Sequence, residues 1–142
     1  MRQVTETTEN NSPVIYLIDP DSQLTARLMT LFARTGYKAA CYPSAEEFLD
    51  KEPQLARYGC IVSELKLSGM DCLELLAKLR DNDCRLPMII MTGDPDVSQA
   101  VNALQKKVSD YLVKPVIERE LIRRIKMALR RSKEVQGLTG SG

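Results

Sequence analysis

The stretch Val14-Ile15-Tyr16-Leu17-Ile18-Asp19-Pro20-Asp21 decides the fold of this chain. Its first part is a continuous apolar run rich in β-branched residues, which is typical of a strand buried on both faces of a sheet. The run ends at a proline, which cannot donate a hydrogen bond to a sheet and favours a turn. From Ser22 the apolar residues recur with a helical period, and Gly36 is the expected end of that helix. The folded part of the chain therefore begins with a strand followed by a helix.

The alternation of strand and helix continues along the chain. Ser44 with Glu47, and Asp71 with Glu74, have the spacing of capping boxes at helix starts. Further strands are predicted at residues 37–41, 60–63, 88–91 and 110–113. Further helices are predicted from residue 44 through Leu55, from residue 71, from Asp94-Pro95 through Gln105, and from about 117 to 133.

Five strands that alternate with helices require parallel pairing and right-handed crossovers, which place helices on both faces of the sheet. We therefore predict an α/β fold: a doubly wound five-stranded parallel sheet of the flavodoxin-like order 2-1-3-4-5, with five helices. A length of 142 residues leaves room for one domain. We assign residues 1–12 to a disordered leader, 13–133 to this domain and 134–142 to a linker or tail.

Composition excludes several classes of function. The chain has no histidine, which excludes catalytic Ser/His or Cys/His pairs and imidazole-bound zinc. A net charge of +1 gives no general attraction to nucleic acid or to an anionic membrane. A polar amino terminus and short apolar runs predict a cytoplasmic protein. Four cysteines without metal-type spacing are predicted to be reduced and mostly buried: Cys41, Cys60, Cys72 and Cys84.

Four polar side chains come directly after predicted strands. Asp19 follows the first strand and Glu64 the third, while Thr92 and Lys114 follow the fourth and the fifth. In an open parallel sheet, a site forms at the carboxyl ends of the strands, near the point where the strand order reverses. We therefore expect these four side chains to surround one small crevice.

The order of these residues resembles the pattern of response-regulator receiver domains. That pattern has an acid after the first strand, a carboxylate after the third, a Thr-Gly pair after the fourth and a Lys-Pro pair after the fifth. The resemblance covers about residues 13–131 and is greatest to receivers that precede LuxR-type helix-turn-helix output domains. It implies a role in two-component signal transduction. The supporting stretches are Gly36-Tyr37, Tyr42-Pro43-Ser44-Ala45-Glu46-Glu47-Phe48-Leu49, Leu73-Glu74-Leu75, Arg85-Leu86-Pro87, Met91-Thr92-Gly93 and Asp110-Tyr111-Leu112-Val113-Lys114-Pro115.

Two positions depart from the family pattern. In the family, an aspartate after the third strand accepts a phosphoryl group from a histidine kinase, and two acids after the first strand hold the required magnesium ion. When the motifs are aligned with the family, Glu64 occupies the position of the phosphoacceptor and Pro20 the position of the main metal-ligating aspartate. Asp19 keeps the first acidic position. Because Pro20 supplies no side-chain oxygen, we expect weak or absent magnesium binding, no other cofactor and little phosphorylation.

The resemblance also assigns the rest of the phosphate pocket. Thr92 and Lys114-Pro115 match the family's phosphate-contacting residues, and Tyr111 stands at the position of its switch aromatic. Glutamate is one methylene longer than aspartate, so the Glu64 carboxylate reaches toward the place of a phosphoryl group. We predict an ion-paired cluster of Glu64, Asp19 and Lys114, in which Glu64 is a partial phosphomimic.

These features predict a regulatory module and not an enzyme. Its output is expected through a homodimer formed by helix 95–105, strand 110–113 and helix 117–133, or through a partner protein, with no membrane contact. DNA binding is expected only through an output domain outside this chain. Such an output domain would imply a role in transcription regulation. The basic residues of the last helix are interpreted as a solvated face or a dimer contact, because no interleaved aromatic residues or helix-turn-helix accompany them.

Two alternatives stay open at this level. A receiver competent for phosphorylation would use Glu64 or a nearby carboxylate such as Asp71. A flavodoxin-like redox protein is disfavoured, because Asp19-Pro20-Asp21 would repel the phosphate of a flavin.

Overall fold

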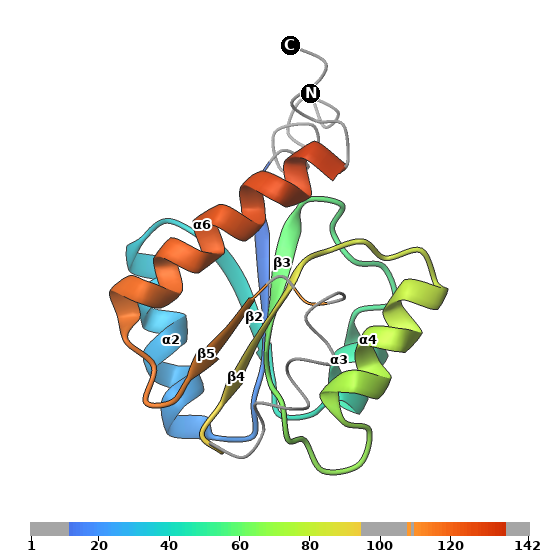
Figure 1. The fold of residues 1–142 in the computed structure, drawn as a ribbon, viewed down its shortest axis with the longest axis horizontal. Coiled ribbons are helices and arrows are strands. Elements are labelled where there is room, and N and C mark those ends of the chain that lie inside the picture. The colour runs from blue at the N-terminus through green and yellow to red at the C-terminus, as the bar shows by residue number, and fades with distance from the viewer. Residues whose placement is uncertain (1–11, 95–107, 109, 136–142) are drawn as a thin grey trace.

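The computed structural model describes residues 12–94, 108 and 110–135, and five parallel strands in this part of the chain form one sheet (Figure 1). The strand order is β2-β1-β3-β4-β5, so the winding direction reverses between β1 and β3. The order and the parallel pairing confirm the predicted fold class. The strands are β1 Val14–Ile18, β2 Lys38–Tyr42, β3 Gly59–Glu64, β4 Met88–Thr92 and β5 Asp110–Val113.

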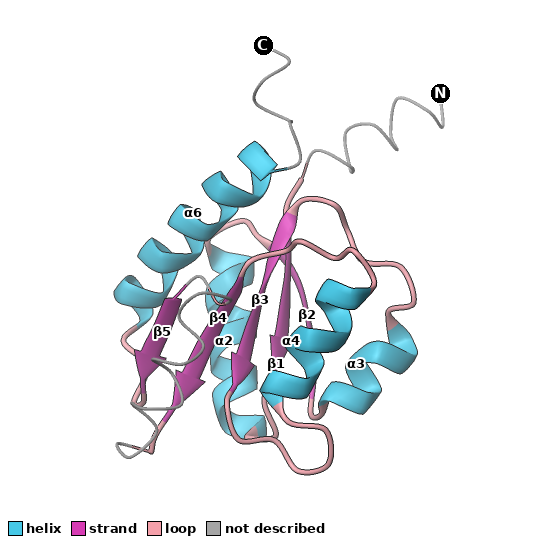
Figure 2. Ribbon diagram, turned by 45° about the vertical axis from the view of Figure 1, so that its right-hand side comes forward, coloured by secondary structure: helices cyan, strands magenta, loops and turns pink. Residues whose placement is uncertain are grey.

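Helices cover both faces of this sheet. Among the described residues, α2 and α6 pack on one face, and α3 and α4 pack on the other (Figure 2). The predicted helix from Asp94-Pro95 through Gln105 lies outside the described residues, so four of the five predicted helices can be compared. Their bounds are α2 Ser22–Arg34, α3 Ala45–Lys51, α4 Cys72–Asp81 and α6 Glu118–Val135. None of these four helices has the length and apolar character that a bilayer span requires.

Local capping interactions define the ends of the helices. The Asp21 carboxylate accepts two backbone N–H groups in the first turn of α2. Asp71 and Glu74 form the complete capping box predicted for α4, with each side chain accepting the other residue's N–H. Gly36 follows the end of α2 with a φ of +87°, a left-handed conformation that favours glycine.

One predicted helix end is wrong. The sequence analysis extends the second helix to Leu55, but α3 ends at Lys51. Pro53 explains the earlier end, because a proline disfavours the helical conformation of the residue before it. That residue, Glu52, has a φ of −124° and a ψ of 69°. Leu55 instead packs against the core from the loop between α3 and β3.

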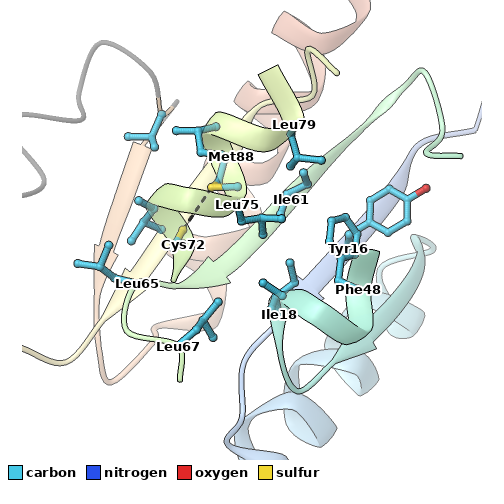
Figure 3. Packing of buried hydrophobic residues seen from close by; sticks show 14 of the residues in the cluster. Tyr16, Ile18, Phe48, Ile61, Leu65, Leu67, Cys72, Leu75, Leu79 and Met88 are labelled. Carbon is cyan, nitrogen blue, oxygen red and sulfur yellow. Dashed lines mark hydrogen bonds between the residues drawn. The ribbon is translucent and has the colours of Figure 1, made fainter. Parts of the chain in front are cut away.

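The sheet separates two apolar clusters. In the cluster under α3 and α4, Phe48 is fully buried and its ring centroid lies 5.5 Å from those of Tyr16 and Tyr42. Figure 3 shows Phe48 beside Tyr16 and, in the same cluster, the hydrogen bond from the Cys72 thiol to the Met88 sulfur at 3.4 Å. Burial of this aromatic and aliphatic surface is a main source of folding free energy.

The cysteines divide by their place in the sheet and helices. Cys60 and Cys72 are buried as predicted, and burial raises the pKa of each thiol to about 12, so both stay protonated at neutral pH. Cys84 is half-buried. For Cys41 the prediction of burial is wrong, because this residue lies on the edge strand β2, where its side chain is exposed.

Candidate functional site

The carboxyl edge of the sheet brings four polar side chains together. Asp19 follows β1, Glu64 ends β3, Thr92 ends β4 and Lys114 follows β5. Main-chain hydrogen bonds extend the sheet to these positions: the Asp19 N–H donates to the Tyr42 carbonyl at 3.0 Å, and the Lys114 N–H donates to the Thr92 carbonyl at 2.8 Å. Because all five strands are parallel, their carboxyl ends share one edge of the sheet, and Asp19 and Lys114 meet there although they are 95 positions apart in sequence.

One ammonium group binds two carboxylates at this edge. Lys114 Nζ lies 2.8 Å from Asp19 Oδ2 and 2.7 Å from Glu64 Oε1. The Asp19 side chain is only 1% exposed, the Glu64 side chain 12% and the Lys114 side chain 21%. Charged groups with so little exposure to solvent require close partners, because the desolvation of an unpaired ion is costly. The three residues, named here the ion triad, satisfy that requirement together.

Main-chain donors bind the second oxygen of each carboxylate. Asp19 Oδ1 accepts the N–H of Asp21 at 2.8 Å, and Glu64 Oε2 accepts the N–H of Lys66 at 2.9 Å. Each carboxylate is therefore held on one side by the Lys114 ammonium and on the other by its own following loop. This arrangement fixes the orientation of both carboxylates without any other ligand.

The ion triad raises the pKa of Lys114. Burial alone would lower this pKa, but hydrogen bonds to Asp19 and Glu64 and the negative charge of both carboxylates outweigh it, and the net shift is upward from the ordinary value of 10.5. Lys114 is thus a permanent cation at neutral pH.

Thr92 takes part in a neighbouring contact. The sequence analysis places Thr92 in the same pocket as Glu64, and the Glu64 side chain bonds to Lys114. The buried Thr92 hydroxyl oxygen instead accepts the N–H of Asp94 at 3.2 Å, and the Asp94 carboxylate forms an ion pair with Lys66. Sequence analysis missed Lys66 and Asp94 because both lie in loops, where no periodicity indicates which side chains meet.

The remaining predicted positions, Pro20, Pro115 and Tyr111, are not members of the ion triad. Pro20 is exposed and lines, with Asp19, a hollow of about 220 Å³ between the β1–α2 and β2–α3 loops. Pro115 follows Lys114 through a cis peptide bond and is exposed. Tyr111 is exposed on β5. Pro20 and Pro115 therefore belong to the loops that carry Asp19 and Lys114, while Tyr111 lies on the outer surface of β5.

The donor set at this edge does not fit a magnesium ion. Mg²⁺ requires a near-octahedral set of oxygen ligands, whereas the carboxylates of Asp19 and Glu64 are both bound to an ammonium group. Pro20 offers no side-chain oxygen, and the Asp21 carboxylate caps α2. Across the residues that the structure describes, no group of three or more His, Cys, Asp or Glu side chains could hold a metal ion.

A doubly wound parallel sheet with carboxylates, a threonine and a lysine at its carboxyl edge defines the receiver class of signalling domain. The chain belongs to the response regulator receiver domain family, whose profile matches residues 15–126. It is thus a receiver domain of two-component signalling, in a family of signalling domains and not of enzymes. This membership replaces the flavodoxin-like redox alternative.

The similar proteins include transcription regulators. The chain is 35% identical to the transcriptional regulatory protein FixJ of Bradyrhizobium diazoefficiens, over 83% of this chain and 57% of that protein. It is 32% identical to the response regulator protein TmoT of Ectopseudomonas mendocina, over 82% of this chain and 53% of that protein. The crystal structure of full-length FixJ from B. japonicum matches with a TM-score of 0.77 and 34% identity, over 85% of this chain and 59% of that chain. The chain thus spans a little over half the length of these relatives, and FixJ-like relatives fit the predicted LuxR-type output class.

Proposed function

We propose that this receiver domain signals without phosphoryl transfer, with Glu64 as a built-in, partial substitute for a phosphorylated aspartate. The observation that carries the proposal is the 2.7 Å contact between Glu64 Oε1 and Lys114 Nζ, at the edge where the family places its phosphate pocket. Phosphorylation adds nearly two negative charges and three acceptor oxygens, whereas glutamate supplies one charge and two oxygens. Both Glu64 oxygens already have partners, and Pro20 removes an oxygen that a metal would need.

The size of the Glu64 contribution limits the proposal to a partial bias. A charge-assisted hydrogen bond contributes about 1.5–3 kcal/mol, while reversing a two-state equilibrium from 1:99 to 99:1 takes about 5.5 kcal/mol. Glu64 therefore shifts the domain fully toward an active state only when the two states are already close in free energy.

We further propose that the output is a homodimer through the surface formed by β5 and α6. The large apolar side chains that are exposed in the described residues lie on these two elements or, for Ile117, directly before α6, and exposed apolar surface of this kind marks interaction sites: Tyr111, Val113, Ile117 and Met127. The ion pair between Arg124 of α6 and Asp110 of β5 holds the two elements together. The predicted contribution of residues 95–105 to this surface lies outside the described residues.

For the whole protein, we propose transcription regulation through a DNA-binding output domain that adjoins this receiver, with the protein in the cytoplasm. The support is the similarity to FixJ, a transcriptional regulatory protein of which this chain spans 57%. The competing receiver that accepts a phosphoryl group would use Glu64 or Asp71. Asp71 is occupied as the N-cap of α4, where it accepts the Glu74 N–H at 2.9 Å, so the first experiment below is directed at Glu64.

Incubation with acetyl phosphate and magnesium should leave the natural chain unmodified, whereas the double variant Pro20→Asp/Glu64→Asp should gain the mass of one phosphoryl group. The double variant restores both an aspartate acceptor and a second metal-ligating acid, which the phosphoryl chemistry requires. Intact-mass spectrometry measures the modification, and each single variant serves as a control that restores only one of the two requirements. Efficient labelling of Glu64 or Asp71 in the natural chain would contradict the proposal.

The substitution Glu64→Gln should weaken dimerisation, because it keeps the size of the side chain and removes the charge that binds Lys114. The upper limit of the effect is roughly 10- to 150-fold in the dimer dissociation constant, from the free energy of one charge-assisted hydrogen bond. Analytical ultracentrifugation measures this constant. Asp50→Asn, which removes a charge from an exposed position on α3, is the matched control and should have no effect. Equal dimerisation of Glu64→Gln and the natural chain would show that Glu64 is not a mimic.

A further inference from the structure

The outward face of α6 carries basic residues in one line. Arg119, Arg123, Lys126 and Arg130 are separated by four, three and four residues, a spacing that aligns them along one side of a helix over about 16 Å. All four are exposed on a helix that lies on the outside of the sheet (Figure 1). These four residues are named here the basic line of α6. The opposite side of the helix is buried through Leu121, Ile125, Ala128 and Leu129.

Among the residues that the structure describes, three of the four members of the basic line form no ion pair. Arg123 binds Glu120 at 2.5 Å. The ion pairs formed within residues 12–94, 108 and 110–135 do not include the other three members, Arg119, Lys126 and Arg130. The line therefore presents a net positive charge to the solvent, even though the chain as a whole carries a net charge of only +1.

A helix face that serves only solubility usually mixes charges of both signs. The exposed side of α4 does so with Glu74, Lys78 and Asp81. On the basic line, by contrast, each neighbouring pair at i,i+3 or i,i+4 has like charge, and such pairs destabilise a helix. The repulsion between these like charges lowers the stability of α6. A contact with an external anion explains why the line contains only positive charges.

The composition of the line indicates the kind of anion. A second copy of this chain would bring two positive lines together in a symmetric contact, which repulsion disfavours. The centre of a protein–protein contact combines arginine with aromatic and apolar side chains, but the basic line contains no aromatic or apolar side chain. Arginine and lysine alone suffice for contacts with the phosphate backbone of nucleic acid, which carry affinity without reading base sequence.

We propose that the basic line of α6 contacts the phosphate backbone of duplex DNA. The inference rests in part on the proposed function, since an adjoining output domain would bring this face close to DNA. DNA contact by the basic line is compatible with the proposed dimer. The dimer surface uses the neighbouring side of α6, where Arg124 and Met127 lie beside Asp110. The sequence analysis assigned DNA contact to an output domain alone. The exposure of the line, and the net positive charge that remains after Arg123 has paired with Glu120, extend the contact to this domain.

The test measures binding of the 142-residue chain to a fluorescent DNA duplex of random sequence. Fluorescence anisotropy gives the binding constant at each of a series of salt concentrations. The logarithm of the binding constant should fall linearly with the logarithm of the salt concentration. In the triple variant Arg119→Gln/Lys126→Gln/Arg130→Gln, the slope should be smaller in magnitude by about 2.7, because three phosphate contacts are lost at about 0.9 each. The variant should melt no lower than the natural chain, since it removes repulsion within α6.

The matched control is Lys51→Gln/Arg57→Gln/Lys78→Gln, which removes three exposed positive charges from the α3–α4 side of the molecule. It has the same net charge as the first triple variant and should keep the natural slope. An equal loss in both triple variants would show a general charge effect and overturn the proposal, as would binding to polyglutamate without binding to DNA. Phosphorylation of Glu64 would overturn the proposed function but leave these slopes unchanged, so the two failures are distinguishable.

Discussion

The substitution Lys114→Met should lower the free energy of unfolding at neutral pH by about 3–5 kcal/mol, the typical cost of removing one partner from a buried ion pair. Methionine has a similar length but no charge, so the Asp19 carboxylate, which is 1% exposed, and the Glu64 carboxylate would lose the cation that both share. Two nearby carboxylates without a counter-charge repel each other and resist desolvation. Urea denaturation measures the difference.

The pH dependence should separate this variant from the natural chain. In the natural chain the folded-state pKa of Lys114 is raised, so its stabilisation is complete below its ordinary pKa of 10.5 and is lost as the pH rises through the folded-state pKa. Lys114→Met should lack this alkaline loss.

Lys66→Met is the matched control for this experiment. Its ammonium pairs with Asp94, but the Lys66 side chain is 67% exposed, and an exposed ion pair contributes less than about 1 kcal/mol. The second substitution Glu64→Gln in the Lys114→Met background should recover part of the loss, because one of the two repelling charges is removed. Equal stability of Lys114→Met and the natural chain would mean that the ion triad does not hold the site together.

The substitution Phe48→Ala should lower the free energy of unfolding by about 3–5 kcal/mol. Phe48 is fully buried between α3 and the sheet, and its ring contacts both Tyr16 and Tyr42. The two tyrosines cannot readily move into the cavity, because their hydroxyl groups are held: Tyr42 donates to the Glu52 carboxylate, and Tyr16 accepts the Ala56 N–H at 2.9 Å. The total free energy of unfolding of a single domain is about 5–15 kcal/mol, so this loss is a large part of it.

Denaturation with urea should show the loss as a lower midpoint with an unchanged slope. Leu49→Ala, at the next position on α3, is the control and should cost less, because Leu49 is only partly buried. A loss below that of Leu49→Ala would contradict the assignment of Phe48 to the centre of the cluster. Phe48 lies outside the ion triad, so the folded fraction of this variant should keep the alkaline pH dependence that Lys114 confers.

Most of the secondary structure follows from local sequence signals. The apolar run at residues 14–18 and the run at 110–113 match β1 and β5. The Asp71–Glu74 capping box marks the start of α4, and Gly36 follows the end of α2. These signals act within a few residues, so they are readable without the fold. Among the described helices, the wrong end at Leu55 comes from giving an apolar residue more weight than the proline two positions before it.

Exposure of single residues depended on tertiary structure. Cys41 lies in an apolar-looking stretch, yet it is exposed because β2 is the edge strand of the sheet. The predicted strand order implied this edge position, but which side chains of an edge strand remain uncovered depends on where the helices pack. The pairing of Lys66 with Asp94 likewise depends on the conformation of two loops that no periodic pattern describes.

The sequence by itself determined the alternation of strands and helices, the parallel sheet, and the presence of Asp19, Glu64, Thr92 and Lys114 at one edge. Only the tertiary structure decided that a single ammonium group binds both carboxylates while Thr92 accepts a main-chain N–H. The physical reason is one of scale. Periodicity places a residue on a strand end to within several ångströms, whereas an ion pair forms or fails over about one ångström, and that distance is set by the packing of the whole domain.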